Sequence, residues 1–141
     1  MAILTASSQA AVGSGAGEIS YGLKAVVLDN AVALTNGAGP YNSTNTAYRG
    51  SFYGGGSIVI ANTGGAGPAV TLNIQGSMDN STFYNVPYAL VATPRTFVVS
   101  AISITTTATT AYLLQELVPY QYLKCVWSNV TNETVTATAW I

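Results

Sequence analysis

The sequence predicts an all-β fold, an antiparallel β-sandwich of jelly-roll-like type with an extended N-terminal arm. From Ser57 onward, short segments rich in Val, Ile, Thr and Tyr follow one another about every ten residues, bounded by Gly, Pro, Asn or Ser. Apolar and polar residues alternate within them, which buries one face of each strand. No stretch after residue 35 has the apolar periodicity of a helix of ordinary length.

The chain divides into an arm and one domain. Residues 1–17 are mainly Ala, Ser and Gly, so we expect an arm that is flexible or becomes ordered against a partner. Residues 18–141 are predicted to form a single β-sandwich domain. Its first apolar segment, 18–34, favours a strand over a short helix around AVVL. The stretch 35–56 is dense in Gly, Asn and Pro, which predicts a long loop.

The segment VTLNIQGSMDNSTFYNVP, residues 70–87, predicts a β-hairpin. Val70, Leu72 and Ile74 share one strand face, and Asp79 lies in a polar turn. Pro87 indicates an edge position or a break between two short strands. The predicted strands from this region onward are 57–62, 69–77, 83–91, 95–104, 111–118, 121–128 and 133–141.

Composition limits the classes of ligand. Charged residues make up 6% of the chain, against about 25% in an ordinary domain. The solvent-exposed polar surface must therefore consist mainly of uncharged residues such as Thr, Ser, Asn, Gln and Gly. The net charge is −1 and the four cations are scattered, which argues against nucleic acid as a partner. Weak repulsion between copies permits close association in an oligomer or lattice.

The chain lacks the residues that most catalytic sites need. It has no histidine, which removes imidazole bases and histidine metal ligands. A turn role is favoured for Asp79 over a weak calcium site in SMDNST. Cys125 alternates with Leu123 and Trp127 on one strand face, which predicts a buried apolar filler. We therefore expect a protein that is not an enzyme, with no catalytic residues, cofactor or metal; nothing in the sequence brings together any two of the five carboxyl residues, Glu18, Asp29, Asp79, Glu116 and Glu133.

Two segments bear on membranes and targeting. The N-terminus has no basic residue before Lys24 and only a short apolar run, so no secretory signal is expected. Residues 96–115 are uncharged but contain six threonines and two serines, which predicts two strands joined by a polar turn. The expectation is a soluble protein without a membrane partner.

Aromatic residues in the 35–56 stretch are the best candidates for a binding surface. Tyrosine suits protein contacts because it is large, amphipathic and stiff, although the same side chains also stack on sugars or pack beneath a loop. The apolar start of the arm is the other candidate. The predicted partner-binding residues are Ala2, Ile3, Leu4, Tyr41, Tyr48, Phe52 and Tyr53.

The segments QGSMDNSTFYNVP and PYQYLKCVW, followed by a polar turn and an alternating Thr/Val strand, carry a resemblance. Over residues 57–141 the chain resembles small β-sandwich virion proteins of tailed bacteriophages, of which the capsid decoration, or cement, proteins are the nearest group. The resemblance implies a non-enzymatic homotrimer, made in the host cytoplasm, that binds the major capsid protein on the outer capsid surface and stabilises contacts between capsomers.

Two other functions stay open at this point. The first is a tail, fibre or head-spike component of the virion, with a different partner for the same kind of domain. The second is a carbohydrate-binding module or receptor-binding tip, which would present exposed coplanar tyrosines in a groove.

Overall fold

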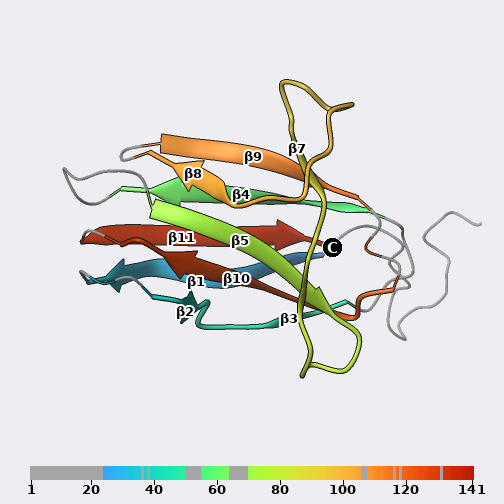
Figure 1. Cartoon of the computed structure of the whole chain (residues 1–141), viewed down its shortest axis with the longest axis horizontal. Coiled ribbons are helices and arrows are strands. Elements are labelled where there is room, and N and C mark those ends of the chain that lie inside the picture. Colours follow the sequence, from blue (N-terminus) through green and yellow to red (C-terminus); the bar gives the residue numbers. More distant parts are fainter. Residues whose placement is uncertain are drawn as a thin grey trace, which may run out of the picture.

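The computed structural model describes residues 24–35, 37, 39–49, 55–63, 70–105, 108–115, 117, 119–130 and 132–141. Within these ranges every helix-or-strand element is a strand, as Figure 1 shows. The predicted all-β class is therefore confirmed. The strands are β1 (Ala25–Leu34), β2 (Tyr41–Asn42), β3 (Ala47–Tyr48), β4 (Gly56–Asn62), β5 (Val70–Ser77), β6 (Tyr84–Asn85), β7 (Tyr88–Leu90), β8 (Ile102–Ile104), β9 (Ala108–Leu114), β10 (Tyr122–Ser128) and β11 (Glu133–Trp140).

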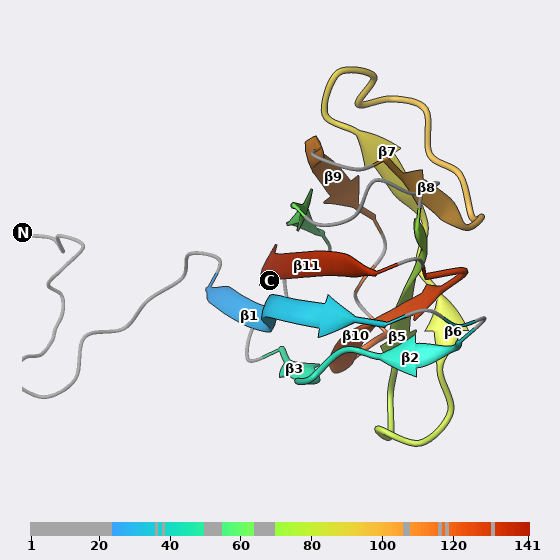
Figure 2. The ribbon, with the colours of Figure 1, turned by 90° about the vertical axis from the view of Figure 1, so that its left-hand side faces the viewer.

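The strands form two antiparallel sheets. The first sheet has the order β1-β11-β4-β9-β7. In the second sheet β10 pairs with β2 and β3 on one side and with β5 on the other, and β5 also pairs with β6 and β8. With β2 and β3 taken as one strand and the short β6 and β7 set aside, this is the strand order of a jelly roll. Figure 2 shows β1 and β11 in one layer and β5, β6 and β10 in the other.

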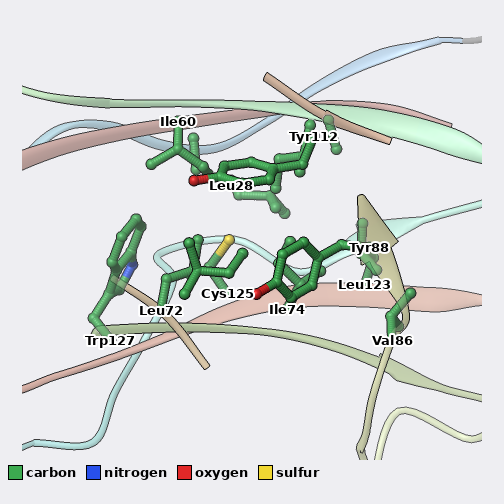
Figure 3. Packing of buried hydrophobic residues seen from close by; sticks show 14 of the residues in the cluster. Leu28, Ile60, Leu72, Ile74, Val86, Tyr88, Tyr112, Leu123, Cys125 and Trp127 are labelled. Carbon is green, nitrogen blue, oxygen red and sulfur yellow. The ribbon is translucent and has the colours of Figure 1, made fainter. Parts of the chain in front are cut away.

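The core lies between the sheets and is built by strict alternation. Side chains of the first sheet such as Ile60 and Tyr112 meet Leu72, Cys125 and Trp127 of the second, and Figure 3 shows these two layers in contact. The inward positions of β10 and β11 are all buried, while their outward positions are half-buried. Each large apolar side chain removed from water in this way contributes about 1.5–3 kcal/mol.

A β-bulge in β1 breaks the alternation and places a polar group in the core. The pairing of β1 with β11 shifts register on both sides of Asp29, so Leu28 and Asp29 are both buried. The Asp29 Oδ1 accepts a hydrogen bond from the Thr44 N–H at 2.7 Å. Its Oδ2 accepts one from the Trp127 Nε1–H at 2.9 Å. Because β1 and β10 belong to different sheets, Asp29 joins the two layers.

The hairpin predicted over 70–87 is confirmed. β5 pairs with β6 so that Gln75 lies opposite Asn85, and the predicted inward residues Val70, Leu72 and Ile74 are buried. Pro87 separates the short strands β6 and β7, as expected of a residue that cannot donate to a sheet.

Three strand predictions need correction. The stretch 35–56, predicted as a loop, supplies β2 and β3, because the edge of β10 still needs backbone partners. Of the strand predicted over 95–104, only 102–104 belongs to β8, and the rest is a loop that projects beside β7 (Figure 1). The strand predicted to begin at Ala111 already begins at Ala108, because pairing with β4 draws Thr109 and Thr110 into the sheet.

Candidate functional site

The outer face of the second sheet carries the most varied exposed chemistry among the described residues. On β10, Tyr122, Lys124 and Val126 alternate with the buried Leu123, Cys125 and Trp127 and therefore point outward. Neighbouring strands add Tyr48 and amide side chains, and the turn before β6 adds Phe83. We call this surface the aromatic–amide face; it consists of Asn42, Tyr48, Asn73, Gln75, Phe83, Asn85, Tyr122, Lys124 and Val126.

An aromatic pair forms one end of this face. Tyr48 on β3 lies directly opposite Tyr122 on β10 in the register of the two strands. The ring centroids are 5.3 Å apart and the ring planes are inclined by 47°. Such a pair is worth about 0.5–1.5 kcal/mol beyond burial of its area, so it keeps the rings in place. Tyr48 is nevertheless 62% exposed, which leaves most of the ring available to a partner.

The single positive charge of the face is held over a third ring. The Lys124 Nζ lies 3.9 Å from the centroid of Phe83. A cation–π contact of this kind contributes about 0.5–1 kcal/mol where it is exposed to solvent. Lys124 is the next outward residue after Tyr122 on β10, so the cation and the tyrosine pair belong to the same surface.

Amide side chains fill the remaining positions. Gln75 lies between Lys124 and Asn85 in the strand register, and its Nε2 donates a hydrogen bond to the Asn85 Oδ1 at 3.1 Å. Asn42 and Asn73 flank Val126 in the next outward row. Each amide both donates and accepts, so the face can pair with backbone, hydroxyl or amide groups of a partner.

The turn between β5 and β6 holds Phe83 beneath Lys124. The Asp79 Oδ1 accepts hydrogen bonds from the Ser81 and Thr82 N–H groups and from the Ser77 hydroxyl, each at 2.9 Å. The bonds from Thr82, Ser81 and Ser77, in that order, lower the pKa of Asp79 below its ordinary value. The turn role favoured over calcium binding is thus the one this carboxylate has here.

Each described carboxyl residue has its own place in the fold. Asp79 lies in the turn, Asp29 is bonded to Trp127 in the core, and Glu133 is buried at the start of β11. Glu18 and Glu116 lie outside the described residues. Within the described part of the chain, no group of three or more His, Cys, Asp or Glu residues is placed to hold a metal ion.

Cys125 occupies the predicted position on the buried face of β10. Its side chain has no exposed surface, which confirms the expectation of a small core residue. Burial raises the pKa of the Cys125 thiol well above its ordinary value, and the negative charge of Asp29 raises it further. The thiol is therefore protonated and unreactive in the folded protein.

The predicted partner-binding residues that the structure describes, Tyr41 and Tyr48, lie in different surroundings. Tyr48 belongs to the aromatic–amide face. Tyr41 lies opposite Trp127 in the strand register and packs half-buried against the core, so it is not part of this face. The remaining predicted residues, Ala2, Ile3, Leu4, Phe52 and Tyr53, lie outside the described residues.

Sequence reasoning missed Phe83, Tyr122 and Lys124. The alternation in YLKCVWS was sufficient to place Tyr122 and Lys124 opposite the buried residues of that strand. Phe83 gave no such signal, because only the turn after β5 brings it across to β10.

The connection between β7 and β8 projects from the sandwich (Figures 1 and 2). It carries exposed apolar side chains. This connection is held to β7 by reciprocal backbone hydrogen bonds between Tyr88 and Val98. Its exposed large apolar residues are Val91, Val98 and Val99, and Leu90 at the end of β7 precedes them. In the described part of the chain, no helix is long and apolar enough to cross a membrane.

Comparison with known proteins gives a likeness of fold. No protein-family model matches the chain, and no curated protein sequence matches it significantly. The crystal structure of the SPBc2 prophage-derived protein YomS is similar, with a TM-score of 0.53 over 83% of this chain and 90% of that chain. The two sequences are 11% identical, so the likeness shows a shared architecture.

Proposed function

We propose that the chain is a bacteriophage virion protein that binds the outer surface of the capsid and stabilises contacts between capsomers without catalysis. Its partners are the major capsid protein and further copies of itself in a homotrimer. The observation that carries the proposal is the aromatic–amide face, where an exposed tyrosine pair and a fixed cation lie on a rigid sheet. The fold shared with a prophage-derived protein supports a phage origin.

The chemistry of the face supports protein binding. Tyrosines on a rigid strand lose little conformational entropy on binding, and the amides pair with backbone groups that a partner exposes. The carboxyl groups of Asp29 and Asp79 are occupied by hydrogen bonds within the fold, which supports a non-catalytic role. In a symmetric assembly several such contacts act together, so each of them can be weak.

The test is co-sedimentation of the purified chain with DNA-free expanded capsids of the phage that encodes it. We expect stoichiometric binding and a higher melting temperature of the capsid. Tyr48→Ala should weaken binding by about 30-fold, since a tyrosine anchor contributes about 2 kcal/mol. Tyr84→Ala is the matched control, because Tyr84 is 52% exposed on the same sheet but lies opposite Gly76, outside the face. A chain that does not bind capsids refutes the proposal.

A tail, fibre or head-spike position is the alternative virion role. Immunogold electron microscopy of intact virions separates it from the proposed one: label over the head surface supports decoration, and label on the tail or on a single head vertex contradicts it.

Glycan binding is a second candidate function, favoured by the same tyrosines and amides. Aromatic rings stack on the apolar face of a sugar, and amides bond its hydroxyl groups. The 47° inclination of Tyr48 to Tyr122 departs from the coplanar platform that this function predicts. A glycan array probed with the labelled chain decides the matter: a signal lost in Tyr48→Ala establishes sugar binding, and no signal removes it.

A further inference from the structure

The outer face of the first sheet carries no charged side chain. The strand register identifies its residues. For example, one row across β1, β11, β4 and β9 consists of Val27, Thr138, Val59 and Ala111. All residues of this surface are half-buried or exposed. We call it the neutral face; it consists of Ala25, Val27, Ala33, Ser57, Val59, Ala61, Thr109, Ala111, Leu113, Thr134, Thr136, Thr138 and Trp140.

The neutral face differs from an ordinary solvent-facing sheet. The water side of an antiparallel sheet is normally polar and commonly charged. Here the only charged residues on the strands of this sheet, Asp29 and Glu133, are buried. The outward positions hold Ala, Ser, Thr, Val, Leu and Trp alone, and Val27 is 45% exposed.

The size of the face suits an association between proteins. Four strands spaced about 4.8 Å apart and the eight residues of β11, each rising about 3.3 Å, span about 19 Å by 26 Å, or about 500 Å² in projection. Two such faces together bury about 1,000 Å², which is about the lower bound for a specific interface between proteins. Small residues such as Ala61, Ala111 and Thr138 let another flat sheet approach closely.

We propose that the neutral face is covered by a second copy of this chain. The lack of charge on this face favours a partner surface that also has none. A partner surface with charged groups would lose their hydration against this face without gaining a counter-charge. The neutral face of another copy has no charge to desolvate, and the net charge of −1 leaves little repulsion between copies. The proposal rests on the proposed function and names the surface that performs its self-association: in the homotrimer, the neutral faces of the three copies meet around the three-fold axis, so that each face is covered by its neighbours.

The experiment measures the mass of the full chain by sedimentation velocity over a concentration series. Oligomers in the micromolar range are expected for the wild-type chain. Val59→Lys and Thr138→Lys each place a charge at the centre of the face, and each should weaken self-association by about 100-fold or more, because an unpaired charge is then buried. Thr138→Lys replaces a half-buried polar residue, so it provides a second test if Val59→Lys does not fold. Circular dichroism checks that each variant is folded.

The matched control is Ser103→Lys, an exposed strand position on the outer side of the second sheet. Its mass should equal that of the wild-type chain. A chain that is monomeric at about 100 µM overturns the inference. So does an oligomer that folded Val59→Lys and Thr138→Lys variants both preserve.

This result is separable from the test of capsid binding. A monomeric chain that still sediments with capsids overturns the inference about the neutral face and leaves the proposed function standing. If the lysine variants keep the wild-type mass but lose capsid binding, the neutral face contacts the capsid instead, which also overturns the inference. Self-association that the lysine variants abolish, in a chain that does not bind capsids, supports the inference about the neutral face and refutes the proposed function.

Discussion

The hydrogen bonds of Asp29 across the sandwich give a quantitative prediction about stability. Asp29→Ala leaves the buried Trp127 N–H and the partly buried Thr44 N–H without their acceptor. A buried donor without a partner costs about 1–3 kcal/mol, so we assign about 2 kcal/mol to Trp127 and about 1 kcal/mol to Thr44, whose N–H is closer to water. The free energy of unfolding should fall by about 3 kcal/mol.

Asp29→Asn separates the two contributions. Its single amide oxygen can keep the bond from Trp127 while the NH₂ group turns toward Thr44, so only about 1 kcal/mol should be lost. Both variants remove the same carboxyl group from the core, and the difference of about 2 kcal/mol therefore isolates the bond to Trp127.

The assay is equilibrium unfolding in urea, followed by far-ultraviolet circular dichroism and tryptophan fluorescence, with equal m-values required of all variants. Asn30→Ala is the control, since Asn30 is the exposed neighbour of Asp29 on the same bulge. If Asp29→Ala lies within about 0.5 kcal/mol of the wild-type chain, or if Asn and Ala cost the same, the two sheets are not joined in the way described.

Two further predictions concern single side chains. The Cys125 thiol should react with Ellman's reagent only as fast as the chain unfolds, because burial and the charge of Asp29 raise its pKa. The urea-unfolded chain supplies the reference rate. Rapid reaction of the native protein would contradict the buried position of Cys125. The lowered pKa of Asp79 means that its turn bonds stabilise the fold above the ordinary pKa of aspartate, and that this stability is lost as pH falls through the lower, folded-state value. The melting temperature of Asp79→Ala should therefore lie below that of the wild-type chain at neutral pH and approach it on acidification; a gap that does not change with pH would show that the hydrogen bonds to the ionised form are unimportant.

The two outer faces of the sandwich suggest a division of roles within the proposed function. The aromatic–amide face supplies directional groups: phenol rings, amides and one ammonium group held over Phe83. The neutral face supplies area without charge. Because the chain has so few charged residues, it can form a broad surface such as the neutral face, on which no charged side chain has to be desolvated when a partner binds.

Much of the fold could be predicted because strand alternation is a local property. In YLKCVWS the buried residues are the apolar Leu123, Cys125 and Trp127. In ETVTATAW the small or apolar Val135, Ala137 and Ala139 are buried, together with Glu133 at the start of the strand. The strand favoured around AVVL is present as β1, but nothing in the sequence indicated its bulge, which buries Leu28 and Asp29 in succession. The predicted start of the following strand at Ala111 missed Thr109 and Thr110, which look like turn residues until β4 pairs with them. The candidate site was predicted in part, since Tyr48 was identified while Phe83 and Lys124 were not.

The sequence by itself determined the all-β class, the inward faces of β5 and β10 and the burial of Cys125, because each of these follows from neighbours one or two residues away. Only the tertiary structure decided which strands lie side by side. Hydrogen bonding between distant segments sets that order, and no local pattern encodes it. The pairing brings Tyr48 to Tyr122 and Lys124 to Phe83, and it joins outward rows from β1, β11, β4 and β9 into one surface without charge.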